Sequence, residues 1–150
     1  MSAAYFDASG LVKLLVVEDG SQLADDVWDR ADLAVSSRLA APQVRAALAA
    51  ARRGRRVSPA QERAASETWR AYDEALRYLP LTATIAARAG DLASRHALSG
   101  ADAVHLATAL VLAPINVLVV TWDRRLHLAA LAEGLAVAPA ELDAVKPPSW

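Results

Sequence analysis

The stretch NVLVVTWD (residues 116–123) decides how this chain folds. It is a continuous run of branched apolar residues, which is typical of a strand buried on both faces of a parallel sheet. We therefore expect it to lie centrally in such a sheet. Outward from this stretch, segments with helical spacing alternate with short apolar segments along the whole chain. This alternation predicts an α/β fold, a mostly parallel sheet covered by helices on both sides with right-handed crossovers.

The other elements follow from periodicity and from turn residues. AYFDAS (residues 4–9) is the first predicted strand, and further short strands are predicted at 33–37, 79–81 and 135–139. A short helix is expected from residue 10 to the turn at 19–20. Longer helices are predicted at 21–31, 38–53, 58–77, 82–98, 100–113 and 124–134. The length fits one domain over residues 1–150, with a loose tail over 146–150.

Composition and charge exclude several classes of protein. The chain has no cysteine, which excludes disulfides, thiolate metal sites and a cysteine nucleophile and favours a cytoplasmic location. Its longest apolar stretch (residues 109–122) is shorter than the roughly 20 residues of a membrane span, and no signal peptide is evident. The net charge is −1, so any contact with a nucleic acid has to be local.

Three aspartates are predicted to meet at one edge of the sheet. Asp7 follows the first strand and Asp123 follows the strand at 116–123, and ligands of parallel sheets bind at the carboxyl ends of the strands. Asp102 lies in the first turn of its helix, and that helix end points to the same edge. Crowded carboxylates repel one another unless a cation neutralises them. The pattern therefore predicts a Mg²⁺ site that activates water for in-line attack on a phosphodiester.

Each aspartate also has a purely structural interpretation. Asp123 is a good N-cap for the helix that follows it. Asp102 completes a capping-box pattern with Ser99. Asp7 is harder to explain in this way, because we expect Ser9 to cap the next helix, and a buried carboxylate without a partner is unfavourable.

Four segments in this order resemble the PIN-domain ribonucleases, specifically the VapC toxins of bacterial toxin–antitoxin pairs. The resemblance implies a PIN-like three-layer α/β/α sandwich and a Mg²⁺ or Mn²⁺ site. It further implies cleavage of structured RNA such as tRNA or rRNA, a homodimer, and a VapB-type antitoxin that covers the site. The four segments are YFDASGLVKLLVVEDGS (5–21), LAVSSRLAAPQVRAALAAA (33–51), LSGADAVHLATAL (98–110) and VLVVTWDRRL (117–126).

One acidic position of the resemblance is not matched. Asp7, Asp102 and Asp123 match the first, third and fourth acidic positions, but Gln43 stands where the family usually has glutamate. Glutamine keeps a carbonyl acceptor and can orient water, yet it cannot act as a base or neutralise a cation. Two alternatives stay open: a nuclease weakened by Gln43, and a PIN-like protein that binds RNA or its antitoxin without cutting. Gln43 also fits an ordinary boundary position on its helix.

Glu62 is a possible substitute carboxylate for Gln43, although we expect it to close a helix cap. The hydroxyls of Ser9 and Thr121 are candidates to support the metal site. His105, one turn after Asp102, is expected to be a packed core histidine in preference to an RNA contact. One dense basic run surrounds Gly54 and fits either an RNA phosphate clamp or a solvated loop. It comprises Arg52, Arg53, Arg55 and Arg56.

Overall fold

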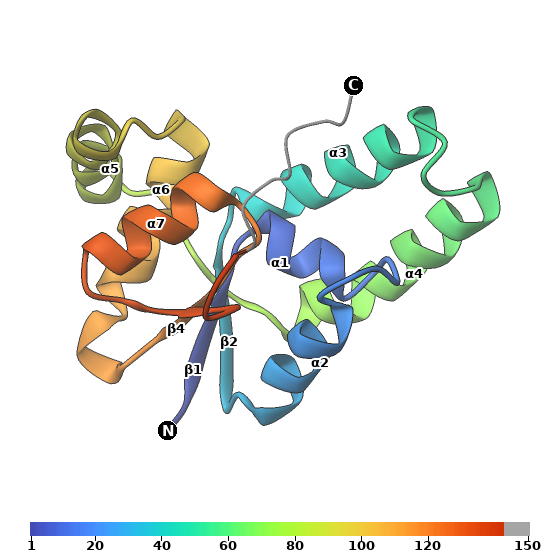
Figure 1. The fold of residues 1–150 in the computed structure, drawn as a ribbon, viewed down its shortest axis with the longest axis horizontal. Coiled ribbons are helices and arrows are strands. Elements are labelled where there is room, and N and C mark those ends of the chain that lie inside the picture. Colours follow the sequence, from blue (N-terminus) through green and yellow to red (C-terminus); the bar gives the residue numbers. More distant parts are fainter. Residues whose placement is uncertain (143–150) are drawn as a thin grey trace.

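A five-stranded parallel sheet forms the centre of the molecule (Figure 1). The computed structural model describes residues 1–142, so the predicted tail over 146–150 lies outside the described residues. The strand order is β3-β2-β1-β4-β5. The strands are β1 (Ala3–Phe6), β2 (Leu33–Ser37), β3 (Arg77–Leu79), β4 (Leu118–Val120) and β5 (Ala136–Ala138).

Helices cover both faces of this sheet, which confirms the three-layer sandwich (Figure 1). One face is covered by α1 (Ala8–Lys13), α2 (Ser21–Arg30), α3 (Ala40–Arg53) and α4 (Pro59–Ala75). The other face is covered by α5 (Ala83–His96), α6 (Gly100–Val111) and α7 (Arg124–Ala132), and a short 3-10 helix, η1 (Ala113–Ile115), leads from α6 to β4. No helix within residues 1–142 is long and apolar enough to cross a membrane.

The core is split by the sheet because side chains alternate along each strand. Tyr5 faces the layer of α5, α6 and α7, whereas Phe6 faces the layer of α1 to α4. All four residues of β1 are buried, as expected for a strand with neighbours on both sides. Because β1 ends at Phe6, the next residue, Asp7, lies at the carboxyl edge of the sheet.

Three predicted strands differ in detail from the structure. The middle strand is β1, and β4 is an inner strand beside it, so residues 116–123 contribute a strand next to the centre and not the central one. β1 ends at Phe6, and the chain enters α1 at Ala8, earlier than expected. β3 covers residues 77–79 and ends before Pro80, which cannot donate a ladder hydrogen bond.

Candidate active site

Asp7 is buried at the junction of β1 and α1, with only 3% of its surface exposed. Its N–H donates to the Val120 carbonyl oxygen (3.3 Å), and its Oδ1 accepts from the Gly10 N–H (2.8 Å). Asp7 is thus the N-cap of α1. The prediction that Ser9 caps this helix was wrong, because the chain turns into the helix two residues earlier.

Two hydroxyls hold the Asp7 carboxylate in place. Ser9 Oγ donates to Asp7 Oδ1 (2.7 Å), and Thr121 Oγ1 donates to Asp7 Oδ2 (2.7 Å). Ser9 Oγ also accepts from the Trp122 N–H (2.8 Å), which ties α1 to the end of β4. The structure therefore places Ser9 and Thr121 against Asp7, the neighbourhood expected for supporting residues.

Asp123 and Asp102 sit at the starts of two helices that open toward the same edge. Asp123 is the N-cap of α7, and its Oδ1 accepts from the Leu126 N–H (2.9 Å). The capping interpretation of Asp123 is therefore confirmed. At α6 the cap is Ser99, whose Oγ accepts from the Asp102 N–H (3.2 Å). The reciprocal hydrogen bond from the Ser99 N–H to the half-buried Asp102 carboxylate is not formed, so only half of the predicted capping box is present.

The three carboxylates act on one another electrostatically. Burial, assisted by the charge of Asp123, raises the pKa of Asp7 to about 6, against hydrogen bonds from Gly10, Ser9 and Thr121 that lower it. The pKa of Asp102 is raised by burial, then by the charge of Asp123 and also by that of Asp7. Residues from distant parts of the sequence thus lie near enough for their charges to act on one another.

The donor set suits a hard divalent cation, although it is not a closed cage. Within residues 1–142 no group of three or more His, Asp or Glu side chains is arranged to enclose a metal ion. Asp7 accepts three hydrogen bonds and Asp123 one, and a carboxylate offers about four lone pairs. Carboxylate oxygens with spare lone pairs fit Mg²⁺, which binds through one or two carboxylates and keeps several waters.

Gln43 is joined to the same region through a buried histidine. Gln43 lies in the first turn of α3, and its Oε1 is 2.6 Å from His105 Nε2. His105 Nδ1 is in turn 2.7 Å from the Tyr5 hydroxyl. His105 is 1% exposed, which confirms a core histidine, and burial lowers its pKa to about 4, against the charge of Asp102. Gln43 is therefore a partly exposed residue whose carboxamide is held by a buried histidine.

Tyr5 is a residue of this region that the sequence reasoning missed. It belongs to β1 and lies two positions before Asp7, so the alternation of the strand places both side chains on the side of α6. That alternation was the available signal. The pairing of Tyr5 with His105, a hundred positions away, follows only from the packing of α6 on β1.

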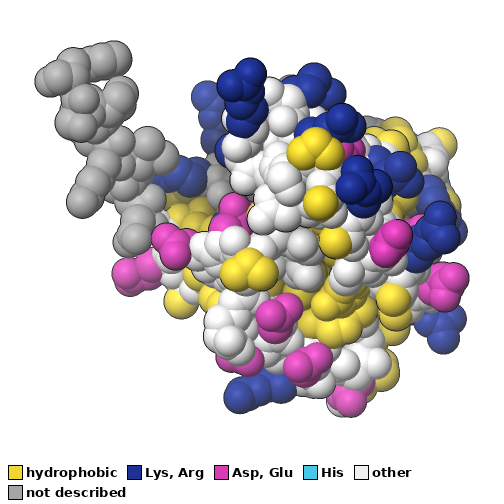
Figure 2. Space-filling model, turned by 90° about the vertical axis from the view of Figure 1, so that its right-hand side faces the viewer, with side chains coloured by type: hydrophobic (Ala, Val, Ile, Leu, Met, Phe, Trp, Pro, Cys, Tyr) yellow, Lys and Arg dark blue, Asp and Glu magenta, His cyan; other side chains and the backbone are white. Residues whose placement is uncertain are grey.

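The four arginines of the basic run lie at the opposite end of α3 from Gln43. Figure 2 shows Lys and Arg side chains gathered over the upper part of the face that contains the α3–α4 connection. Arg52 pairs with Glu62 (3.3 Å), and Gln61, not Glu62, closes the capping box with Ser58. Glu62 is thus engaged at this end of α3, so it is not a substitute carboxylate for Gln43.

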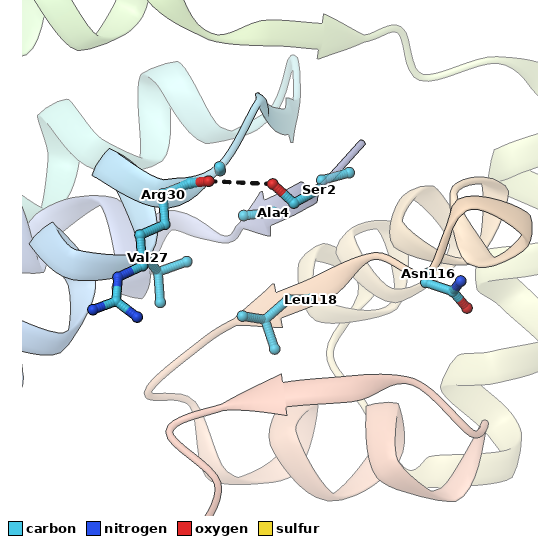
Figure 3. A pocket seen from close by; sticks show the side chains of 8 residues that line it. Ser2, Ala4, Val27, Arg30, Asn116 and Leu118 are labelled. Carbon is cyan, nitrogen blue, oxygen red and sulfur yellow. Dashed lines mark hydrogen bonds between the residues drawn. The ribbon is translucent and has the colours of Figure 1, made fainter.

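An apolar hollow of about 310 Å³ opens at the amino-terminal edge of the sheet, away from the aspartates. Ala4, Val27 and Leu118 line it, and Arg30 stands at its rim (Figure 3). The Ser2 hydroxyl donates to the Arg30 carbonyl oxygen across its mouth (3.2 Å). Among residues 1–142, no carboxylate lines this hollow, which sets it apart from the aspartate region.

Comparisons with known proteins find related sequences. The sequence profile of the PIN domain matches residues 4–133. Ribonuclease VapC45 of Mycobacterium tuberculosis (strain CDC 1551 / Oshkosh) is 52% identical over 143 residues, 95% of this chain and 99% of the relative.

Two solved structures share the fold. A toxin–antitoxin complex from Klebsiella pneumoniae has a TM-score of 0.57 at 21% identity and covers 80% of this chain and 86% of its own. VapC20 of Mycobacterium tuberculosis, described as a toxin that cleaves the sarcin–ricin loop, has a TM-score of 0.61 at 19% identity. That match covers 85% of this chain and 95% of VapC20.

Proposed function

This chain belongs to the PIN-domain family and, within it, to the VapC ribonucleases, and from that premise we propose a metal-dependent endoribonuclease, the toxin of a bacterial toxin–antitoxin pair. Its chemistry is placed at Asp7, Asp102 and Asp123. The observation that carries this proposal is the placement of these three side chains at the starts of α1, α6 and α7, at one edge of the sheet, where their charges raise the pKa values of Asp7 and Asp102. A divalent cation would offset the repulsion within this cluster, and it would activate water for hydrolysis of a phosphodiester.

In this proposal the three aspartates bind the metal ion, and two hydroxyl groups position Asp7. Asp102 and Asp123 have unused carboxylate lone pairs, and together with Asp7 they would hold Mg²⁺ or Mn²⁺. Bound there, the ion would lower the pKa of a water and offset charge on the phosphate. Ser9 and Thr121 fix both oxygens of Asp7, so that the ligand is oriented before the substrate arrives.

We place the substrate among structured RNAs such as tRNA or rRNA. VapC20, which shares the fold, is described as cleaving the sarcin–ricin loop. The cluster of Arg52, Arg53, Arg55 and Arg56 offers guanidinium groups for RNA phosphates on a chain whose net charge is only −1.

The proposed protein partners are a VapB-type antitoxin and a second copy of the chain. The Klebsiella pneumoniae protein of the same fold was solved as a toxin–antitoxin complex. A hollow of about 260 Å³ between the α1–α2 connection and α4, lined by both apolar and polar side chains, suits an amphipathic antitoxin helix. Val17, 98% exposed, lies in its lining. A cytoplasmic location in a bacterium follows from this proposal.

Incubation of the protein with total cellular RNA and Mg²⁺ or Mn²⁺ tests the nuclease proposal. We expect cleavage that EDTA abolishes and that Asp7→Asn reduces at least ~100-fold, because metal assistance supplies several kcal/mol. Asp91→Asn, which changes an exposed aspartate of α5, is the matched control and should cleave normally. Equal cleavage by Asp7→Asn would refute the mechanism.

A second candidate function is that of a PIN-like protein that binds RNA or its antitoxin without cutting. It is favoured by Gln43, which stands where the family usually has glutamate. The same assay with Gln43→Glu distinguishes the two functions. Cleavage by the wild type supports the nuclease, whereas cleavage only after Gln43→Glu supports the binding protein, because the fourth negative charge would then be what the site lacks.

A further inference from the structure

A chain of two short hydrogen bonds links three layers of the molecule beneath the aspartates. Tyr5 of β1, His105 of α6 and Gln43 of α3 are joined by contacts of 2.7 and 2.6 Å. Tyr5 and His105 are fully buried, whereas Gln43 is partly exposed. The chain therefore runs from the core toward the solvent and ends at the position where the family usually carries glutamate.

The direction of these hydrogen bonds is set by what each atom can donate. The Gln43 carbonyl oxygen is only an acceptor, so His105 Nε2 must carry the proton between them. Burial favours the neutral ring, which carries a single proton. His105 Nδ1 is then an acceptor, and the Tyr5 hydroxyl donates to it.

This order leaves the Gln43 carboxamide with one free end. Its oxygen is taken by His105, and its NH₂ group makes no hydrogen bond to any residue in the described part of the chain. The amide is planar, so the NH₂ group points away from the buried ring. His105 lies one helical turn after Asp102, which places the carboxamide beside the carboxylate region.

We propose that Tyr5 and His105 are positioning residues that turn the Gln43 NH₂ group outward, where it donates a hydrogen bond to a phosphate oxygen of the RNA. This inference rests on the proposed ribonuclease function and deepens it, because it makes residue 43 a substrate contact. A neutral donor attracts an anionic phosphate, whereas a carboxylate at the same place would repel it.

The tautomer of His105 is the first test and does not depend on cleavage. Two-bond ¹H–¹⁵N correlation of the histidine rings at neutral pH should show the proton on Nε2 of His105. In Tyr5→Phe, which removes the donor to Nδ1, the Nε2–H form should lose population. A wild-type ring protonated on Nδ1 would overturn the inference. Nε2 would then accept a hydrogen bond from the Gln43 NH₂ group, and the carboxamide would have the opposite orientation.

The second test is a double-mutant cycle read as binding of a labelled RNA stem-loop by fluorescence anisotropy. Gln43→Ala should weaken binding roughly tenfold, the loss expected for one hydrogen bond to a charged group. Tyr5→Phe should also weaken RNA binding. The double variant should bind RNA no more weakly than Gln43→Ala alone. Gln43→Glu should also bind RNA more weakly than the wild type.

Tyr72→Phe is the matched control for the removed hydroxyl. Tyr72 lies on α4, packs edge-on against Trp28, and its hydroxyl has no hydrogen-bond partner within residues 1–142. It should leave RNA binding unchanged, and thermal melting checks that every variant is folded. Additive losses from Tyr5→Phe and Gln43→Ala would overturn the inference. An absence of cleavage with these binding results intact would instead count against the nuclease proposal alone.

Discussion

The Asp7 carboxylate is buried, and burial disfavours its charged form. We therefore expect the folding stability of the protein to depend on pH. The pKa of Asp7 rises from 3.8 to about 6 because of burial, assisted by the charge of Asp123. The folded state therefore binds the proton more tightly than the unfolded state, so stability falls as the pH rises from about 4 to about 6. Two pKa units correspond to at most about 3 kcal/mol.

We predict that Asp7→Asn raises the melting temperature at pH 7.5 by several degrees while it reduces cleavage at least ~100-fold. Asparagine is isosteric, can still accept from the Gly10 N–H and can donate to Thr121, so the helix cap survives. The gain should shrink between pH 6 and pH 4 and vanish below about pH 4, where Asp7 is protonated in both states. Thermal melts in EDTA across this pH range provide the measurement.

Asp91→Asn controls for the loss of one negative charge, since Asp91 is exposed on α5. It should melt like the wild type at every pH. A gain from Asp7→Asn that is equally large at pH 4 would show that the stabilisation does not come from the buried charge.

At the scale of elements, α1 begins directly against the backbone of β4. A Cβ added at Gly10 would lie 2.6 Å from the Val120 carbonyl oxygen and 3.3 Å from a ring carbon of Phe6. Backbone cannot move aside as a flexible side chain can, so Gly10→Ala must push α1 off the sheet. Because the Gly10 N–H binds Asp7, the carboxylate would move with the helix.

We predict that Gly10→Ala costs about 1–3 kcal/mol of unfolding free energy and lowers cleavage as well. Gly90→Ala is the matched control, because Gly90 lies within α5 and a Cβ added there would meet nothing within 4 Å. It should stabilise the protein by up to about 1 kcal/mol, the helix-propensity difference between the two residues. Chemical denaturation of both variants decides the matter. A neutral Gly10→Ala would mean that α1 can shift freely.

The same elements show what the sequence could and could not predict. The boundaries of β2 were correct, and those of α3 to α7 lay within about two residues of the structure, because periodicity and turn residues are local signals. The start of α1 was missed, since Ser9 and Asp7 are both good caps and the choice depends on the contact with Val120. The Tyr5–His105–Gln43 chain was missed because its partners are far apart in sequence.

At the scale of the whole molecule, the aspartates and the arginines occupy separate parts of the surface. The site lies at the carboxyl edge of the sheet, whereas the arginine cluster lies at the far end of α3, roughly 15 Å along the helix from Gln43 at 1.5 Å per residue. This separation was not predictable from composition, which gave only a net charge near zero. An RNA that contacts both regions must span this distance.

We predict that Arg53→Gln combined with Arg56→Gln weakens RNA binding to a similar extent for all sequences and leaves metal-dependent chemistry on bound RNA intact. Arg52 is left in place because it is paired with Glu62. Each phosphate contact that is lost should reduce the slope of log affinity against log salt by roughly 0.7–0.9, so the double variant should lose about 1.5. Anisotropy titrations at several salt concentrations measure the slope.

Arg88→Gln and Arg70→Gln together form the control, because both arginines are exposed and lie on other parts of the surface, on α5 and within α4. The control removes the same formal charge, so any effect of net charge alone appears equally in both double variants. If the two slopes fall alike, attraction of RNA is spread over the molecule and the cluster has no special role. A smaller slope only for Arg53→Gln with Arg56→Gln places RNA phosphates at the α3–α4 connection.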